Sequence, residues 1–315
     1  MQSRLSSSTL IGDVATAYFD LRSLDRQLDI TRRTVKTREA SLDLIRRRHR
    51  RGAVSGLDVS RAESELAAAQ ATLPELKRQS LATENRLRIL LAENPGPVPR
   101  AGRPLAEQFP PQVPAGLPSS LLERRPDLRA AEYNLVSANA LIGATKAALF
   151  PTISLTGLLG GESRALSDLF IGPARTWSLG LSLLQPILNA DASRYQVEAA
   201  RARTEQALQQ YQQTVQQAFR EVSDALNDTA QFNAVHAAQQ EQVRALSRSS
   251  RLAQLRYASG YSSYLEVLDA NRELFAAELA LSQAQRNSLV SVVQLYRALG
   301  GGWMESETSH AVSEG

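Results

Sequence analysis

The stretch RYASGYSSYLEVLDANREL, residues 256–274, decides the fold because it occurs twice. Its counterpart lies 208 positions upstream as RHRRGAVSGLDVSRAESEL, residues 48–66. Both copies hold a glycine, a Leu-acid-Val triplet, an alanine and a Glu-Leu pair at the same spacing. Matches of alanine and leucine alone would be frequent in this composition. The glycine and the two acidic positions in one register therefore indicate an internal duplication.

The second copy predicts a helical hairpin. From Ala190 to Ala258 the chain has neither proline nor glycine, and its apolar residues recur in alternating steps of three and four. This is the heptad pattern of a coiled coil. Residues 259–263 predict a turn with its tip at Gly260, and a second heptad-patterned helix follows until the glycines at 300–302 end it.

The first copy predicts the same hairpin. One helix runs to about Arg50, residues 51–56 form the turn around Gly52, and a return helix follows. Pro74 lies inside that return helix. Because an interior proline removes a hydrogen bond and clashes with the preceding turn, we expect a bend there.

A proline-rich segment divides the chain. Eight of the 13 prolines fall between Pro95 and Pro118, a density that predicts an extended linker. The predicted organisation is an incomplete first repeat (1–94), the linker (95–118), a second repeat (119–303) and a C-terminal tail (304–315). The second repeat comprises a helix over 126–149, a β-hairpin over 151–187 and a helical hairpin over 190–300.

The β-hairpin is patterned differently from the helices. PTISLTGLLG (151–160) and RTWSLGLSLL (175–184) alternate apolar with small or polar residues. Each run has the length of a tilted membrane-spanning strand. A lone hairpin leaves both edges unpaired, so these strands predict oligomerisation or further sequence. Trp177 and Phe170 fit an aromatic belt at the lipid boundary, and ordinary loop packing fits Phe170 equally well.

Composition excludes several functions. Cysteine is absent, the three histidines are scattered, and the net charge is only +4. The absence of cysteine excludes thiolate chemistry and disulfides, and the scattered histidines make a histidine metal site improbable. No phosphate loop or nucleophile motif occurs, so we expect no enzyme, no cofactor and no metal. No apolar run reaches the length of a membrane-spanning helix, and residues 1–20 lack the pattern of a signal peptide.

Four segments of the chain resemble a known family. They are LLERRPDLRAAEYNLVSANALIGATKAALFPTISLTGLLG (121–160), the second strand with QPIL (185–188), the 256–274 motif and LYRALGGGW (295–303). They are similar to the TolC-like outer-membrane factors of Gram-negative tripartite efflux systems, in the lipoprotein subgroup. The resemblance covers the chain up to Trp303. It implies a mainly α-helical fold with a β-hairpin: coiled-coil helical hairpins form an α-barrel, and the strands join a trimeric outer-membrane β-barrel.

The same resemblance implies the function and the partners. The chain would be a homotrimeric channel subunit in the outer membrane with a large periplasmic part. It would serve as the passive exit duct of a pump that exports drugs or metabolites and so confers antibiotic resistance. Its partners would be a periplasmic adaptor protein, an inner-membrane transporter and outer-membrane lipid, with no nucleic acid. The identity of the exported substrates cannot be read from the sequence.

The repeat register predicts a truncated chain. The second repeat begins near Asp127, and its first-repeat counterpart would lie about 80 residues before Met1. The leading helix and β-hairpin of the first repeat, the signal peptide and the acylated cysteine of the lipoprotein subgroup are thus expected to be missing here. Two alternatives to a working duct remain: a cytosolic coiled-coil scaffold, or a non-functional fragment of such a duct. The amphipathic strands argue against the scaffold.

Three residues after the second tip are candidates for a periplasmic gate. Leu265, Asp269 and Arg272 share one helix face, since they are spaced i, i+4 and i+7. In the family, the matched positions close the tunnel with an apolar ring and pairing charged rings. The simpler interpretation is a seam leucine beside a solvated ion pair, worth about 0.3–0.5 kcal/mol.

The two tips are candidates for adaptor docking. The residues assigned to this role are Arg48, Arg51, Gly52, Leu57, Arg256, Tyr257 and Gly260. They include part of the basic run Arg46–Arg51, whose commonest interpretation is a solvated helix end, where cations are favourable. Nucleic-acid binding is a weaker alternative, because no aromatic residue is interleaved in the run.

Overall fold

A computed structural model describes residues 2–100, 104–108, 125–162, 175–185 and 190–301. The chain forms two compact units. One comprises Met1–Pro126 with Ala218–Gly315, and the other comprises Asp127–Gln217. The units therefore cut across the two repeats of the sequence, since α5 (Ala190–Ala258) contributes to both.

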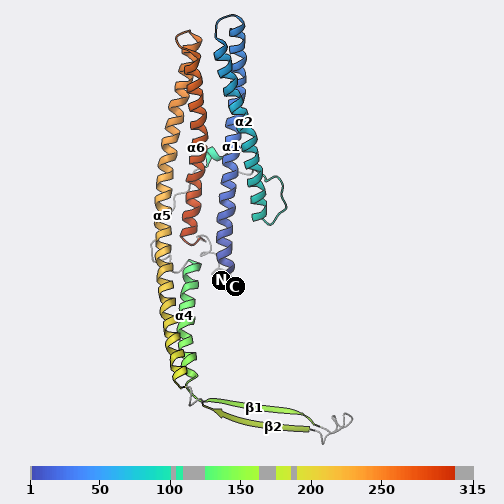
Figure 1. Cartoon of the computed structure of the whole chain (residues 1–315), viewed down its shortest axis with the longest axis vertical. Coiled ribbons are helices and arrows are strands. Elements are labelled where there is room, and N and C mark those ends of the chain that lie inside the picture. Colours follow the sequence, from blue (N-terminus) through green and yellow to red (C-terminus); the bar gives the residue numbers. More distant parts are fainter. Residues whose placement is uncertain (1, 101–103, 109–124, 163–174, 186–189, 302–315) are drawn as a thin grey trace, which may run out of the picture. The chain divides into compact units, whose positions relative to one another are not determined.

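The larger unit consists of two antiparallel helical hairpins (Figure 1). The first is α1 (Gln2–Arg50) with α2 (Gly56–Leu90), and the second is the C-terminal part of α5 with α6 (Tyr264–Ala298). A short 3₁₀ helix, η1 (Leu105–Glu107), lies in the linker. The predicted fold class, mainly α with one β-hairpin, is confirmed. Helix α2 continues through Pro74 as one helix, and the bend expected there stays a prediction.

Helix α1 supplies the centre of this unit, because it packs against both α2 and α6. Its buried side chains form small apolar clusters along the hairpin with partners such as Leu76 and Leu87 from α2. Leu21 and Ile45 of α1 are fully buried. Burial of one such side chain contributes about 1.5–3 kcal/mol, so this row of contacts holds α1 and α2 together.

Polar contacts join the first hairpin to the second. Arg286 of α6 binds Asp20 of α1 at 2.5 Å, and the buried hydroxyls of Ser23 and Ser282 lie 3.3 Å apart. Nearer the tips, the guanidinium of Arg38 lies over the ring of Phe275, 5.3 Å from its centroid. The seam between α1 and α6 is thus partly polar, whereas the interface between α1 and α2 is mainly apolar.

The described part of the linker is attached to both hairpins. Arg100 makes two hydrogen bonds to Asp25 of α1, at 3.0 and 3.2 Å, and also contacts Glu84 of α2. The side-chain amide of Gln285 donates to the carbonyl oxygen of Leu105 at 2.5 Å. Leu105 is almost fully buried. These contacts attach Arg100 to α1 and α2, and Leu105 to α6.

The smaller unit contains α4 (Pro126–Ala147), the first part of α5, and the strands β1 (Thr152–Gly161) and β2 (Arg175–Leu184). Pro126 suits the first turn of α4, where its missing N–H has no helical partner. Thr204 of α5 donates to the carbonyl oxygen of Ala138 at 3.1 Å. This bond ties α5 to α4.

The two strands pair antiparallel in one register, and every residue in them is exposed. One face carries the opposed pairs Ile153–Leu183, Leu155–Leu181, Gly157–Leu179 and Leu159–Trp177. The opposite face carries mostly Thr, Ser and Gly, so the alternation expected from the sequence gives one apolar and one polar face. Phe170, the other aromatic residue considered above, lies outside the described residues. No helix in the described ranges is both long enough and apolar enough to cross a bilayer.

Candidate functional site at the hairpin tips

Each tip turn is built by the same backbone hydrogen bonds. At the first, the N–H groups of Gly52 and Ala53 donate to the carbonyls of His49 and Arg48. This pattern is a Schellman motif, which needs a left-handed residue after the helix. Ser55 then caps α2: its hydroxyl accepts from the Asp58 N–H at 3.2 Å, and the Asp58 carboxylate accepts from the Ser55 N–H. The local sequence therefore ends one helix and starts the next within a few residues.

The tips of the two hairpins pack on one another through an apolar cluster, the tip cluster. Its buried residues are Leu42, Ile45 and Ala62 from the first hairpin and Ala253, Tyr264, Val267 and Ala270 from the second. Figure 1 shows both turns at the same end of the unit. The candidate tip residues of the two repeats, far apart in the sequence, are thus brought to one place.

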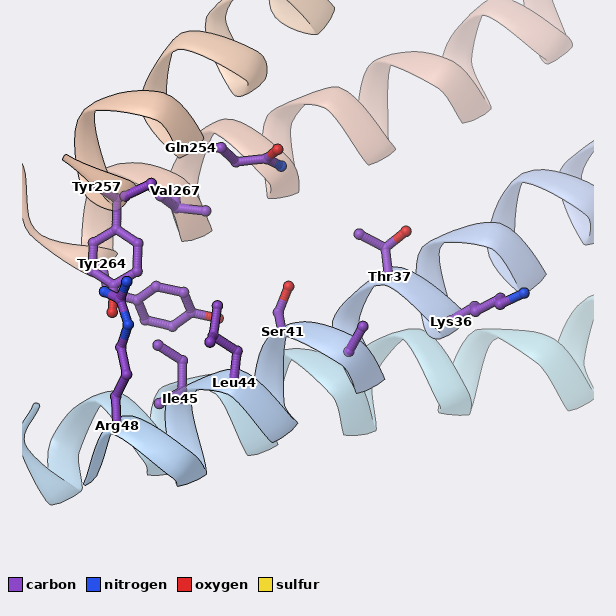
Figure 2. A pocket seen from close by; sticks show the side chains of 12 residues that line it. Lys36, Thr37, Ser41, Leu44, Ile45, Arg48, Gln254, Tyr257, Tyr264 and Val267 are labelled. Atoms are coloured by element: carbon purple, nitrogen blue, oxygen red, sulfur yellow. The ribbon is translucent and has the colours of Figure 1, made fainter. Parts of the chain in front are cut away.

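A stack of one cation and two aromatic rings lies at the edge of the tip cluster. The guanidinium of Arg48 lies 4.8 Å from the ring centroid of Tyr257, and the rings of Tyr257 and Tyr264 are 5.4 Å apart. Figure 2 shows Arg48 extending from α1 to meet the two rings. Burial, with smaller effects of Tyr257 and Glu65, raises the pKa of Tyr264 to about 12, so its hydroxyl stays neutral at physiological pH.

The candidate gate residues lie on the outer face of α6, away from the tip cluster. Leu265 is 42% exposed. The Arg272 guanidinium donates to the Asp269 carboxylate at 3.1 Å, and both side chains are largely exposed. Within one chain this is a solvated i, i+3 pair beside an exposed leucine. The three residues share one face, as their spacing predicts.

The basic run at the first tip is divided among different neighbours. Arg46 pairs with Glu63 of α2 at 2.6 Å, and Arg47 pairs with Asp43 one turn earlier. His49 contacts the carbonyl oxygen of Val54. The run is thus largely engaged in building the tip.

The other candidate tip residues remain accessible. Arg51 and Leu57 are exposed at the first tip. At the second tip, Arg256 pairs with Glu266 across the turn at 3.4 Å. An exposed apolar side chain and exposed cations therefore surround the glycine turns.

A groove of about 550 Å³ opens between α1 and the second tip. Figure 2 shows the side chains that line it. Arg48 and Tyr257 were among the predicted tip residues, but Lys36, Gln254 and Tyr264 were not. No local sequence pattern marks these three, because the groove exists only where α1 meets α5 and α6.

The fold and this site define a class of protein: long duplicated helical hairpins that meet at their tips, joined in one chain to an exposed amphipathic β-hairpin. The chain belongs to the outer membrane efflux protein family, whose model matches residues 2–93 and 117–301. The resemblance noted from the sequence is thereby confirmed.

The relatives agree in sequence and in structure. The solvent efflux pump outer membrane protein SrpC of Pseudomonas putida is 40% identical over 299 residues, which are 95% of this chain and 63% of SrpC. The outer membrane protein OprJ of Pseudomonas aeruginosa is 38% identical over 97% of this chain and 64% of OprJ. The open state of the MtrE outer membrane channel of Neisseria gonorrhoeae superposes with a TM-score of 0.84 at 36% identity, covering 95% of this chain and 67% of MtrE. The chain thus spans less than two thirds of the length of SrpC and of OprJ.

Proposed function

We propose that the chain is a channel subunit of the outer membrane and acts as the passive exit duct of a tripartite efflux pump. The observation that carries this proposal is the β-hairpin. Its apolar face extends from the Ile153–Leu183 pair to the Leu159–Trp177 pair and is exposed along its whole length. Water disfavours such a face, and lipid accepts it. The family match and the names of the relatives support the same assignment.

The duct is formed by three copies. Strands β1 and β2 pair only with each other in the described residues, so each has one free edge. In lipid, unpaired backbone groups are costly, and closure of a sheet into a barrel removes them. Neighbouring copies supply the missing strands. The pump's energy comes from an inner-membrane transporter, and the chain itself performs no catalysis.

The tips have two roles in this proposal. The accessible residues around Gly52 and Gly260 dock a periplasmic adaptor, and the face with Leu265, Asp269 and Arg272 closes the duct at rest. The glycines matter because a Cβ at either position meets no atom within 4 Å, which leaves the turn surface open to a partner. A bulky side chain there would fill that space.

The proposal is tested in cells that lack their own outer-membrane efflux proteins. The chain should be recovered from the outer membrane, cross-link to trimers, and lower the accumulation of ethidium when the pump's other components are present. Gly260→Trp should abolish this efflux and leave the trimers intact, whereas Gly143→Trp, in α4, should preserve efflux. Recovery of the chain only from the soluble fraction would instead favour a coiled-coil scaffold. Unchanged efflux in Gly260→Trp would refute docking at the tip.

A further inference from the structure

The groove beside the tip cluster has an apolar floor and a polar rim. Ile45 and Val267 are buried beneath it, and Leu44 is 41% exposed at its edge. Thr37, Ser41 and Gln254 lie on the rim. All these residues belong to the larger unit. A volume of about 550 Å³ lies within the range of small-molecule sites, which are mostly apolar with a few polar groups.

Two cations border the groove without a carboxylate partner. Among the described residues, neither Lys36 nor Arg48 has an acidic group within ion-pair distance. Neighbouring arginines differ: Arg38 pairs with Glu65 at 3.1 Å, and Arg46 and Arg47 also have carboxylate partners. The lining of the groove therefore carries two cations and no acidic residue.

Arg48 is held in a position to bind an anion. Its guanidinium carbon lies 4.8 Å from the centroid of the Tyr257 ring, and the guanidinium carries five N–H donors in a planar fork. A carboxylate or sulfonate can accept two such hydrogen bonds. The Tyr257 hydroxyl is buried and has no hydrogen-bond partner, so a polar atom placed there would satisfy it. Figure 2 shows this hydroxyl and the Arg48 guanidinium at the same end of the groove.

We propose that this groove binds an amphiphilic organic anion, with a flat apolar body and one sulfonate or carboxylate. The acid group binds at Arg48 and Tyr257, and the body covers Leu44 and Val267. Lys36 lies about 18 Å away along α1, at 1.5 Å per residue. Its attraction for the anion acts at low ionic strength and is screened by physiological salt. A bound anion contacts α1, α5 and α6 together, so it links the two hairpins at their tips. This inference does not depend on the chain acting as a duct.

The test uses the full chain held in amphipol. The probe is 8-anilinonaphthalene-1-sulfonate, an aromatic sulfonate whose fluorescence rises in apolar surroundings. Its uncharged analogue, N-phenyl-1-naphthylamine, reports the apolar contribution alone. The exposed face of the β-hairpin gives a background common to all variants, so affinity is taken from the saturable component. We expect a saturable site for the sulfonate that weakens as salt rises, and much weaker binding of the uncharged analogue.

Three variants decide the outcome. Arg48→Gln should weaken sulfonate binding about tenfold, the loss expected for one charge-assisted hydrogen bond. Arg50→Gln makes the same charge change two residues further along α1, outside the groove, and should leave binding unchanged. Ala40→Trp fills the groove without altering charge and should abolish the saturable component while the helical circular dichroism is kept. Equal binding by the wild type, Arg48→Gln and Ala40→Trp, or an equal loss in Arg50→Gln, would overturn the proposal.

Discussion

Gly52 and Gly260, 208 positions apart, hold the same left-handed backbone conformation, with φ of +71° and +79°. The agreement extends to the other end of the hairpins. Leu91 and Leu299 end their helices with almost equal dihedral angles, and the next residues, Ala92 and Gly300, both have positive φ. The turns thus repeat in the register that the sequence duplication predicts.

Gly52→Ala and Gly260→Ala should each destabilise the larger unit by about 1 kcal/mol. The cost is conformational, because an L-residue in the left-handed region is strained. It is not steric, because a Cβ at either position meets no atom within 4 Å. Urea unfolding followed by helical circular dichroism measures the change. Gly12→Ala, in the interior of α1, is the matched control and should stabilise, since alanine favours helix. A tip variant as stable as the wild type would contradict the strain argument.

Ala92→Gly should have the opposite effect. Ala92 is the only non-glycine residue with positive φ among the described residues, at 57°. The second repeat has Gly300 at the equivalent position. Glycine relieves the left-handed strain, and its entropic cost offsets part of the gain, so the expected stabilisation is about 0.5–1 kcal/mol. Gly300→Ala should lose a similar amount in the same assay. Stabilisation by both substitutions would show that the two turns are not equivalent.

Arg100→Ala should release the linker and destabilise the larger unit by about 1–3 kcal/mol. The substitution leaves Asp25 with only the longer contact to Arg22 at 3.9 Å, and it leaves the buried carboxylate of Glu84 without its cation. Urea unfolding measures the stability, and limited proteolysis measures exposure of the linker. Arg86→Ala, at an exposed position of α2, should change neither. The double variant Arg100→Ala with Glu84→Gln should recover part of the loss, and no recovery would argue against the buried charge as its cause.

Glu278→Gln should stabilise the larger unit at neutral pH. Burial raises the pKa of Glu278, and Asp29 raises it further, against the opposing effects of Arg33 and Arg26. Because the pKa of Glu278 is higher in the folded state than in the unfolded state, protonation of its carboxylate stabilises the folded state. This stabilisation is fully present at pH values below the unfolded-state pKa. It is lost as the pH rises through the folded pKa. The gain from glutamine should therefore be present at pH 7 and disappear in acid. Glu273→Gln, on the exposed face of α6, is the control. A gain in Glu278→Gln that is independent of pH would point to packing instead.

The helices and strands could be predicted because their signals are local. The heptad pattern, the glycines at the turns and the alternation from Ile153 to Leu159 each depend on residues within one element. The Ser55–Asp58 capping box, which marks the start of α2, is an equally local signal.

The groove and the contacts of Arg100 in the linker could not be predicted, because they join residues that are far apart in the sequence. The contact of Arg48 with Tyr257 spans 209 positions, and its geometry depends on how one hairpin packs on the other. The same is true of Arg100, whose partners lie on α1 and α2. The sequence of a basic run shows only its charge. The tertiary packing determines which arginine pairs with a carboxylate and which has no acidic partner.

Asp269→Ala should open the resting duct without unfolding the chain. The Asp269–Arg272 pair is largely exposed within one chain, so its loss costs at most about 0.5 kcal/mol of stability there. In the proposed ring of three copies the same charges would face one another across a narrow space, where an unpaired charge costs more, and three copies would multiply the effect. Single-channel conductance of the trimer in a planar bilayer should therefore rise in Asp269→Ala and in Leu265→Ser. Glu241→Ala removes another exposed i, i+3 partner, that of Arg244 on α5, and should leave the conductance unchanged. Equal conductance in all four proteins would mean that Leu265, Asp269 and Arg272 only complete the surface of α6.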